Sequence, residues 1–492
     1  MDDRIGAWVN HTHGTSSWDS GGSGGVRRRR HAVVIGGSLA GLLTAHVLAG
    51  YADSVTVIER DRFSAAPEPR TGVPQSRHPH VLLEGGQCAL DALLPGFMSE
   101  LRASGAPCVG MPSDMVQWQS GRWFRRTPAT THLYTGSRTQ LELLVRQRAL
   151  ANPVISAVES TEVIGLLGDS SRVRGVLVRE RGAGPAHRTG SDSGAGETRP
   201  LEADLVVDAS GHGSRAPRWL AALGAEPAAE ETIDTGLAYA SRVYRDTGGH
   251  LGTDALAYYV VPNPRQVYGC VVAPLEDGTY LATFSGLRGD EPPTDEDGFT
   301  AYAKRLPHPL VHRWLLESEP LSPVWSFRST ANLRRRYDRP GRRPAGFVAT
   351  GDALCTFNPV YGQGMTVAAM SAVALRDALA DRHRTPTTLR VQRAVFQASR
   401  QAWDISAGAD KKMPGARGNA LAAGALDRPV GWYLDRVQQR YPGDPVVGRA
   451  FRSVLTLRSP LTVLFTPEVA RAVLFGSVPS TPQEPPMHRE GA

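Results

Sequence analysis

Three small residues near the N-terminus have the spacing of a phosphate-binding turn. Gly36, Ser38 and Gly41 form the pattern G-x-S-x-x-G, directly after an apolar stretch typical of a buried strand. Gly36 permits a tight turn, the small side chain at 38 lets a pyrophosphate approach the backbone, and Gly41 lets a helix pack close to the strand. The phosphate would lie at the helix N-terminus, where free N–H groups and the helix dipole favour an anion.

An acidic residue follows at the position that a dinucleotide requires. Glu59 ends a second apolar strand, about 20 residues after the turn, where its carboxylate would accept hydrogen bonds from ribose hydroxyls. Arg60 follows it and is included in the predicted cofactor site. The alternative is a Gly-rich turn without a ligand, but the order strand, glycines, helix, strand and acid favours a dinucleotide.

A second segment, far along the chain, has residues suited to the other end of such a cofactor. A short apolar strand leads into Gly351-Asp352, and a loop with Pro359 leads to Gly364 and Met365 at the start of a long helix. Asp352 would bind the hydroxyls of a sugar alcohol. The N–H groups of Gly364 and Met365 would face the N1–C2=O edge of a flavin, which becomes negative on reduction.

Together these motifs resemble the p-hydroxybenzoate-hydroxylase-type FAD-dependent monooxygenases over most of residues 31–380. The resemblance implies FAD and, as its reductant, NADPH or NADH. It implies a flavin C4a-hydroperoxide as the oxidant, so no nucleophile or catalytic triad is expected. The cofactor-binding residues that it implies are Gly36, Ser38, Gly41 and Glu59 at the ADP half, Arg138 near the phosphates or ribityl chain, and Asp352, Gly364 and Met365 at the ribityl chain and ring.

The central motif of that family is altered in this chain. Residues 208–215 read Asp-Ala-Ser-Gly-His-Gly-Ser-Arg, where the family has Asp-Gly in a stretch that helps to bind FAD and NAD(P)H. A non-redox, FAD-containing cyclase of a polyketide pathway is therefore a second hypothesis. Residues 72–80, this variant and residues 357–365 resemble a bacterial branch that includes the polyether epoxidases. That resemblance implies epoxidation of an alkene or hydroxylation of an arene in a specialised metabolite, a polyketide in antibiotic biosynthesis.

Two further groups of residues are candidates for contacts with flavin or substrate. Arg77, His78 and His80 lie in a Pro-rich loop and are candidates for contacting the flavin or gating its movement; the alternative is a structural or solvated cluster. Aromatic strands further on predict an apolar substrate pocket, with ordinary sheet core as the alternative. The candidates for that pocket are Tyr239, Tyr258, Phe284, Trp325 and Phe327.

Other classes of flavoprotein lack their signatures here. A disulfide reductase needs a second dinucleotide motif and a close cysteine pair, and the four cysteines have no short spacing; they are Cys88, Cys108, Cys270 and Cys355. A flavin halogenase uses an early catalytic lysine and a W-x-W-x-I-P motif, whereas the first lysine here is Lys304 and the motif is absent. A nonenzymatic binding protein is a further alternative, and would be colourless when purified.

Composition limits the remaining options. The net charge is +7, but the arginines are spread along the 492 residues, so no nucleic-acid partner is expected. Arg27–Arg30 and the apolar stretch after them resemble a signal peptide, yet Gly36-Gly37-Ser38 interrupts that stretch and a second strand follows. No membrane span and no metal site are predicted, and the expected location is the cytoplasm. The expected partner is an apolar small molecule.

These motifs need an α/β fold with a Rossmann-like FAD-binding domain of discontinuous segments, an inserted antiparallel-sheet substrate domain and a helical C-terminal region. Helical periodicity is found at 81–104, 138–150, 364–382 and 388–406. The predicted division is a disordered leader at 1–30, FAD-binding segments at 31–110, 136–231 and 333–385, substrate-domain strands at 111–135 and 232–332, a helical region at 386–478 and a loose tail at 479–492.

Overall fold

The apolar stretch after Arg30 forms strand β1 (His31–Ile35), the central strand of a five-stranded parallel sheet. The computed structural model describes residues 29–181, 197–247, 253–341, 343–422 and 427–490, so the predicted leader lies almost entirely outside the described residues. The strand order is β20–β11–β1–β2–β7. The other four strands are β2 (Ser54–Ile58), β7 (Ile155–Val158), β11 (Leu205–Asp208) and β20 (Phe347–Ala349). The predicted Rossmann-like core is therefore confirmed.

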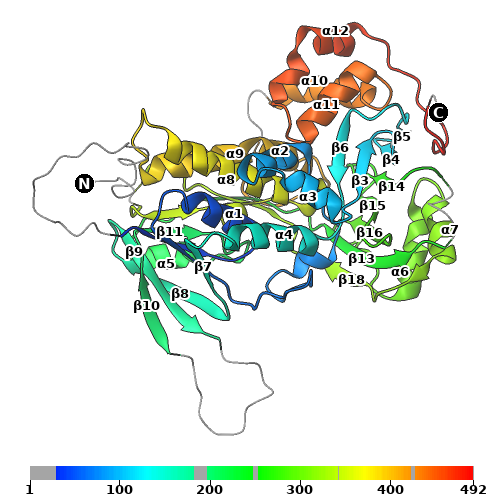
Figure 1. Ribbon diagram of the computed structural model, residues 1–492. Helices are drawn as coiled ribbons and strands as arrows, with labels where there is room; N and C mark the ends of the chain where they lie inside the picture. The colour runs from blue at the N-terminus through cyan, green and yellow to red at the C-terminus, as the bar shows by residue number, and fades with distance from the viewer. Residues whose placement is uncertain (1–28, 182–196, 248–252, 342, 423–426, 491–492) are drawn as a thin grey trace, which may run out of the picture.

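Helices cover one face of this sheet and a second sheet covers the other (Figure 1). Helix α8 (Gly364–Ala380) packs against α1 (Leu39–Leu48), α2 (Glu84–Leu93) and α9 (Thr388–Asp410), while α4 (Arg138–Leu150) packs against α1. On the opposite face lie the antiparallel strands β8 (Thr161–Gly168), β9 (Val173–Glu180) and β10 (Thr198–Glu202). The helix expected at 81–104 is two helices, since Pro95 and Gly96, at φ +82°, separate α2 from α3 (Phe97–Ala103).

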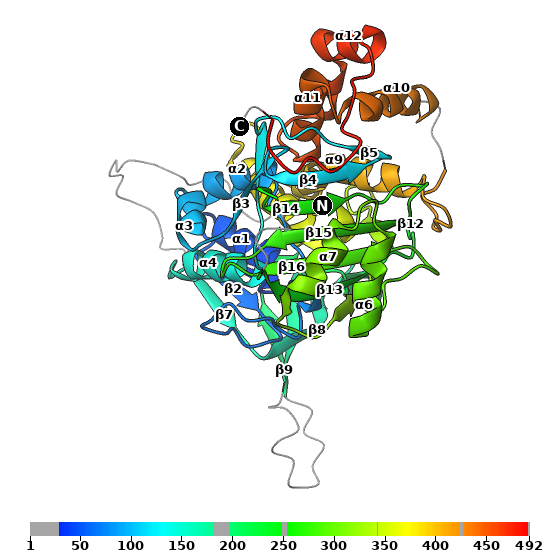
Figure 2. The same ribbon diagram turned by 90° about the vertical axis from the view of Figure 1, so that its right-hand side faces the viewer.

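The substrate domain is built on an eight-stranded sheet, mostly antiparallel, with the order β17–β13–β16–β15–β14–β4–β5 and with β18 paired to β13. Helices α6 (Glu296–Tyr302) and α7 (Leu310–Glu317) cover its outer face, as Figure 2 shows. Its main strands are β4 (Met115–Gln119), β13 (Ala238–Arg245), β14 (Ala257–Val260), β15 (Tyr268–Pro274), β16 (Tyr280–Gly286) and β18 (Trp325–Phe327). We call the opposite face, which turns toward the parallel-sheet half of the molecule, the inner face.

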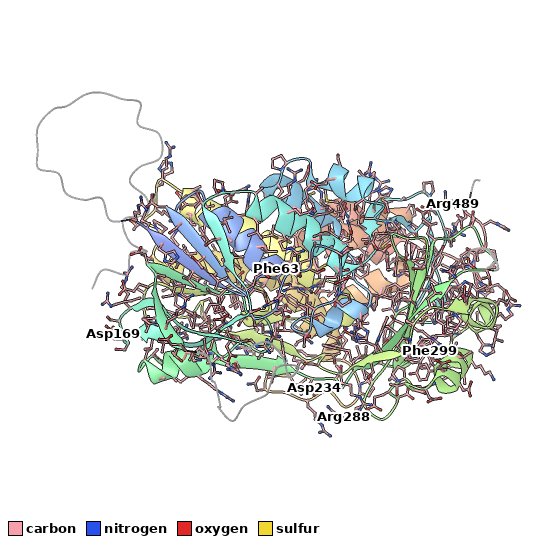
Figure 3. All side chains as sticks on the ribbon, turned by 60° about the horizontal axis from the view of Figure 1, so that its bottom comes forward. Phe63, Asp169, Asp234, Arg288, Phe299 and Arg489 are labelled. Atoms are coloured by element: carbon pink, nitrogen blue, oxygen red, sulfur yellow. The ribbon has the colours of Figure 1, made fainter. Side chains whose placement is uncertain are left out.

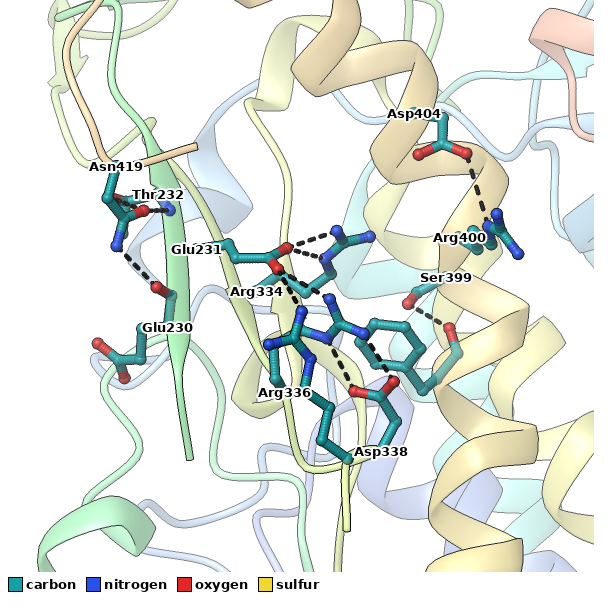
Figure 4. Close-up of polar contacts among 12 residues, drawn as sticks. Glu230, Glu231, Thr232, Arg334, Arg336, Asp338, Ser399, Arg400, Asp404 and Asn419 are labelled. Atoms are coloured by element: carbon teal, nitrogen blue, oxygen red, sulfur yellow. Dashed lines mark hydrogen bonds and ion pairs between the residues drawn. The ribbon is translucent and has the colours of Figure 1, made fainter. Parts of the chain in front are cut away.

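A small antiparallel sheet joins the two halves. It consists of β12 (Glu230–Ile233), β19 (Asn332–Arg335) and β21 (Cys355–Thr356). Glu231 on β12 accepts hydrogen bonds from Arg334 and Arg336, and Arg336 also pairs with Asp338 (Figure 4). The Arg334 guanidinium lies 4.3 Å from the ring centroid of Trp403 on α9. These contacts fix β21, which leads into the loop before α8.

The C-terminal region is helical as expected, with α10 (Asp427–Arg440), α11 (Pro445–Leu455) and α12 (Pro467–Phe475). The tail beyond residue 479 has no helix or strand in its described part, to residue 490, but it is not loose. The fully buried Arg126 pairs with Asp254 at 2.5 Å and donates to the Met487 carbonyl at 2.9 Å. Figure 3 places Arg489 at the same end of the molecule as Phe299. In the described part of the chain, every helix is too short or too polar to cross a membrane.

We predict that Gly41→Ala prevents the fold around α1 from forming properly. A Cβ at this position would lie 1.8 Å from the carbonyl oxygen of Gly36, so the backbone would have to shift. The expected loss is more than about 2 kcal/mol of unfolding free energy, measured by denaturant titration, together with loss of bound flavin. Gly408→Ala is the control, because a Cβ there meets no atom of the described residues within 4 Å. A Gly41→Ala variant as stable as the wild type contradicts this account.

Candidate functional site

Strand β1 ends in a turn that leaves almost no space for side chains. Gly36 has φ +103°, and a Cβ there would lie 2.5 Å from the Ala209 carbonyl oxygen. Helix α1 begins at Leu39, directly after Ser38. The turn lies at the carboxyl ends of the parallel strands, which is where open α/β sheets bind ligands. The spacing of Gly36, Ser38 and Gly41 therefore produces the close backbone approach that a pyrophosphate needs.

Glu59 closes this turn from the end of β2. Its Oε2 accepts a hydrogen bond from the Gly37 N–H at 2.8 Å, and its Oε1 accepts one from the Asp61 N–H at 2.9 Å. The Arg70 guanidinium lies 3.2 Å from Oε2. Glu59 thus positions the backbone of the turn, and its bonds to a ribose remain a prediction. Arg60 is exposed and donates to the Gly72 carbonyl at 3.0 Å, so in this structure it supports the loop at 61–72.

A buried ionic network lies beside Ser38. Arg138, at the start of α4, donates to the Ser38 hydroxyl at 2.8 Å, and that hydroxyl donates to Glu142 at 2.7 Å. Arg70 pairs with Glu142 as well as with Glu59. Sequence reasoning predicted Arg138 but missed Arg70 and Glu142. The spacing of Arg138 and Glu142, one helical turn apart, could have predicted that Glu142 lies beside Arg138. Nothing in the sequence of the Pro-rich loop distinguished Arg70 from its neighbours.

The network leaves donors that fit an anion. Arg138 Nε is buried, makes no hydrogen bond within the described residues and lies 3.8 Å from Glu142 Oε2, whereas Arg70 Nη1 lies 3.2 Å from Glu59 Oε2. The two guanidinium groups and Arg146 line one hollow beside Ser38. Buried donors normally have partners, and leaving one unpaired costs about 1–3 kcal/mol. The diphosphate of FAD would supply acceptors here, so the residues present fit the cofactor.

The second end of the site lies at the carboxyl edge of β20. Asp352 follows this strand in a short 3-10 turn, and burial raises the pKa of its carboxyl, although the positive charge of Arg138 acts to lower it. Arg138 therefore lies near both ends of the site. Gln363 Oε1 is buried without a hydrogen-bond partner in the described part of the chain. A Cβ on Gly364, at the start of α8, would meet none of the described atoms within 4 Å. This end therefore has open space and unpaired polar groups where the flavin ring is expected.

The altered central motif forms a self-contained turn after β11. Asp208 is fully buried, and its carboxylate accepts hydrogen bonds from the Ser210 N–H at 3.0 Å, the Ser210 hydroxyl at 2.6 Å and the Ser214 hydroxyl at 2.5 Å. His212 Nδ1 lies 3.4 Å from the hydroxyl oxygen of Thr356, the last residue of β21, which leads into the loop before α8. The motif therefore contacts the second end of the site, and its serines satisfy the buried carboxylate.

The Pro-rich loop brings its two histidines into buried or half-buried positions. His78 is 5% exposed, its Nδ1 lies 2.8 Å from the Ser241 hydroxyl oxygen, and its ring meets Tyr239 edge-on at 4.7 Å. His80 Nε2 donates to the Gln75 carbonyl at 3.0 Å. Burial lowers the pKa of His78 to about 4, helped by Arg77, and lowers the pKa of His80 to about 3, helped by Arg138. Both rings are neutral at physiological pH.

Arg77 is exposed, unlike these histidines, and its guanidinium lies 5.7 Å from the centroid of the Trp325 ring. A role for Arg77, His78 or His80 in contacting or gating the flavin stays a prediction. What the structure adds is that His78 packs against the inner face of the substrate sheet, through Tyr239 and Ser241.

The aromatic candidates lie on opposite faces of the substrate sheet. Tyr239 is on the inner face and stacks on Phe327 at 5.4 Å, and Trp325 and Phe327 are half-buried on β18. Tyr258 and Phe284 point the other way and fill the core beneath α6 and α7, where Phe284 meets Phe299 at 4.8 Å. Because successive side chains of a strand alternate between faces, these two do not line the inner face.

A hollow lies between the inner face and the loop before α8. Tyr259 lines it from β14, and Val360 and Tyr361 line it from the loop. Sequence reasoning missed Tyr259, although the alternation that sends Tyr258 outward sends its neighbour inward. Leu237 and Leu287 complete an apolar wall. The hollow lies against the loop that leads to the expected flavin ring.

Comparison with known proteins fits this geometry. The family of FAD binding domains (FAD_binding_3) matches residues 29–389, which is most of the chain. The protein belongs to this FAD-binding family. FAD, predicted from the two motifs, is therefore confirmed as the cofactor type, and the matched range contains both ends of the site.

Two sequence relatives extend this result. "Protein Rv3254" of Mycobacterium tuberculosis is 32% identical over 452 residues, which cover 90% of this chain and 93% of that protein. Kynurenine 3-monooxygenase of Salinispora tropica is 27% identical over 399 residues, which cover 76% of this chain and 77% of that enzyme. The predicted enzyme class, a flavin-dependent monooxygenase, is supported by the family and by this relative.

Solved structures share the fold at low sequence identity. p-Nitrophenol 4-monooxygenase PnpA of Pseudomonas putida has a TM-score of 0.59 at 17% identity, covering 87% of this chain and 98% of that one. The flavin-dependent brominase Bmp2 has a TM-score of 0.57 at 18% identity, covering 87% and 93%. These likenesses confirm the fold class.

Among the described residues, no group of three or more potential ligands is placed to hold a metal ion.

We predict that Asp352→Ala weakens FAD binding. Loss of a hydrogen bond between a carboxylate and a ribityl hydroxyl would weaken binding by about 10-fold to 100-fold. The measurement is the flavin-to-protein absorbance ratio after dialysis against a range of FAD concentrations. Asp377→Ala, an exposed carboxylate on α8, is the matched control and is expected to keep wild-type affinity. A yellow Asp352→Ala variant with unchanged affinity would show that Asp352 does not bind the cofactor.

We predict that His78 makes the protein less stable in mild acid. Its folded pKa of about 4 lies below the ordinary value of about 6.5, so the unfolded chain binds a proton first as the pH falls. His78 therefore does not lower the free energy of unfolding above about pH 6.5. Below that pH the free energy of unfolding decreases by up to about 1.4 kcal/mol per pH unit, toward pH 4. The measurement is the difference in melting temperature between the wild type and His78→Gln at two pH values. At about pH 5 the variant should melt closer to the wild type, or above it, than it does at about pH 7.5. An equal difference in melting temperature at both pH values would contradict the lowered pKa of His78.

Proposed function

We propose that this protein is an FAD-dependent monooxygenase that inserts one oxygen atom of O2 into an electron-rich alkene or arene of a specialised metabolite, a polyketide. The product would be an epoxide or a hydroxylated arene. NADPH or NADH would supply the electrons. The observation that carries the proposal is the convergence of the glycine turn, Arg138 and the segment from Asp352 to Met365 on one space beside an apolar hollow.

The residues of the candidate site would have the following roles in this reaction. The N–H groups after Gly36 and the guanidinium groups of Arg70 and Arg138 would bind the diphosphate. Asp352 would accept hydrogen bonds from the ribityl chain, and the first N–H groups of α8 would face the ring. When bound, FAD supplies the redox chemistry that activates O2. The inner face of the substrate sheet would orient the substrate and exclude water.

The alternative is the non-redox cyclase, in which FAD is structural. The altered motif at 208–215 motivates it, because that stretch serves NAD(P)H in the resembling family. Its buried carboxylate is nevertheless fully hydrogen-bonded and its turn reaches Thr356, so the segment keeps an ordered contact with the flavin end. An ordered contact of this kind is compatible with both functions, so the family match and the monooxygenase relative favour the redox enzyme.

The two functions differ in whether NADPH or NADH reduces the flavin. We expect the yellow holoenzyme to oxidise NADPH or NADH, and to do so faster with an electron-rich polyene or phenol. Product formed under O2 labelled with oxygen-18 should carry one labelled atom. The measurements are absorbance of the reduced nicotinamide and mass spectrometry of the product. A flavin that neither nicotinamide reduces under any condition, with or without substrate, would overturn the monooxygenase and favour the cyclase.

A further inference from the structure

One buried carboxyl group holds the loop before α8, residues 357–363, at two points. Asp410, at the end of α9, is 1% exposed. Asn358 Nδ2 donates to Asp410 Oδ2 at 2.9 Å, and the Tyr361 hydroxyl lies 2.7 Å from Oδ1. Both of these partners belong to the loop. A single side chain on α9 therefore fixes the beginning and the middle of the loop.

The same carboxyl group ties the loop to the small sheet that joins the two halves of the molecule. Asn332, on β19, donates from Nδ2 to Asp410 Oδ2 at 2.6 Å. Asn332 Oδ1 accepts from the Asn358 N–H at 2.9 Å and from the Ser406 hydroxyl at 2.6 Å, so its amide nitrogen faces Asp410. Asn358 Oδ1 accepts from the Val360 N–H at 3.2 Å, which orients the second amide in the same way. Strand β19, helix α9 and the loop thus meet at one buried acceptor.

These contacts can form whether Asp410 is ionised or protonated. Burial raises the pKa of its carboxyl group, whereas the hydrogen bonds from Asn358, Tyr361 and Asn332 act to lower it. An ionised carboxylate would accept all three hydrogen bonds. A protonated one would accept at Oδ2 and donate from Oδ1 to the phenol oxygen, which can also accept. The loop therefore needs an acceptor toward the two amides and a polar partner toward Tyr361, and it does not need a charge.

The loop ends where the flavin ring is expected. Tyr361 comes shortly before Gly364, the first residue of α8. Between them, Gln363 is 2% exposed, and its Oε1 makes no hydrogen bond with any described residue. A buried acceptor without a partner is costly, so it marks the side of the loop on which a ligand group fits. The other side of the loop is already paired with Asp410.

A loop that is ordered before its ligand arrives binds more tightly, because less conformational freedom is lost on binding. We propose that Asp410 is a positioning residue for FAD, which holds residues 358–361 so that Gln363 and the first N–H groups of α8 meet the flavin ring. Asp410 acts through Asn358 and Tyr361. This inference rests on the proposed function, since it takes the ring to lie at the start of α8.

The test compares two substitutions of Asp410 in the holoenzyme. Affinity is measured as the flavin-to-protein absorbance ratio after dialysis against a range of FAD concentrations. We expect Asp410→Ala to weaken FAD binding about tenfold, because the loop must then be ordered on binding. Its visible flavin spectrum should shift toward that of free FAD. Asp410→Asn can turn its oxygen toward Asn332 and Asn358 and its N–H toward Tyr361, so we expect an affinity within about twofold of the wild type.

A milder variant tests whether Asp410 acts through Tyr361. Tyr361→Phe removes one of the three hydrogen bonds and should weaken FAD binding about threefold. In the Asp410→Ala background the same substitution should have no further effect, because its partner is already absent. An equal effect of Tyr361→Phe in both backgrounds would show that the two residues act independently and would overturn the proposal.

The matched control is Asp444→Ala. Asp444 is also a carboxyl group that accepts neutral donors, the Val446 and Val447 N–H groups at 2.9 Å, at the start of α11. Its loss should lower the melting temperature and leave the FAD affinity and the flavin spectrum unchanged.

Three outcomes overturn the positioning role of Asp410. They are wild-type affinity and spectrum in Asp410→Ala, an equal loss of affinity in Asp444→Ala, and a loss in Asp410→Asn as large as that in Asp410→Ala. None of these measurements needs nicotinamide or O2. A holoenzyme that oxidises no nicotinamide would therefore overturn the monooxygenase and leave the role of Asp410 to be decided by FAD affinity.

Discussion

The close approach of helix α1 to the end of strand β1 is the constraint on which the rest of the structure depends. The Gly36 carbonyl oxygen lies where any side chain at Gly41 would begin, and Glu59 holds the turn between them through the Gly37 N–H. This contact directs the helix N-terminus toward one point at the edge of the parallel sheet. The segments that follow β11 and β20 end at the same edge, so they meet there although they are far apart in sequence.

Buried charge around that point is balanced in two different ways. Beside the glycine turn, Arg70 pairs with both Glu59 and Glu142, and Arg138 lies next to Glu142, with its Nε making no hydrogen bond within the described residues. On the substrate side, Asp410 is balanced by neutral donors from Asn332, Asn358 and Tyr361. The first arrangement suits an incoming anion. The second arrangement holds the loop before α8, because donors from three separate positions converge on one buried carboxylate.

The two faces of the substrate sheet have separate tasks. The outer face, under α6 and α7, is a continuous aromatic and aliphatic core that includes Tyr258 and Phe284. The inner face carries hydroxyls between its aromatic rings, including Ser241, which lies within hydrogen-bond distance of both His78 and Thr283. The outer face also carries Arg242, which pairs with Glu296 of α6 at 3.0 Å, so the helices are held to the sheet by both apolar packing and an ion pair.

Sequence by itself determined the parallel core and the cofactor type, and it predicted residues of the cofactor site, because those inferences depend on local spacing. A glycine turn between a strand and a helix has few conformations, so Gly36, Ser38, Gly41 and Asp352 could be predicted from their neighbours. Tertiary structure alone decided which aromatic side chains face the hollow, and it brought Arg70, Glu142 and Asp410 to the site. Arg70 pairs with Glu142 across 72 positions and Asp410 with Asn332 across 78. These contacts form only after the sheets have packed, and no local pattern specifies that packing.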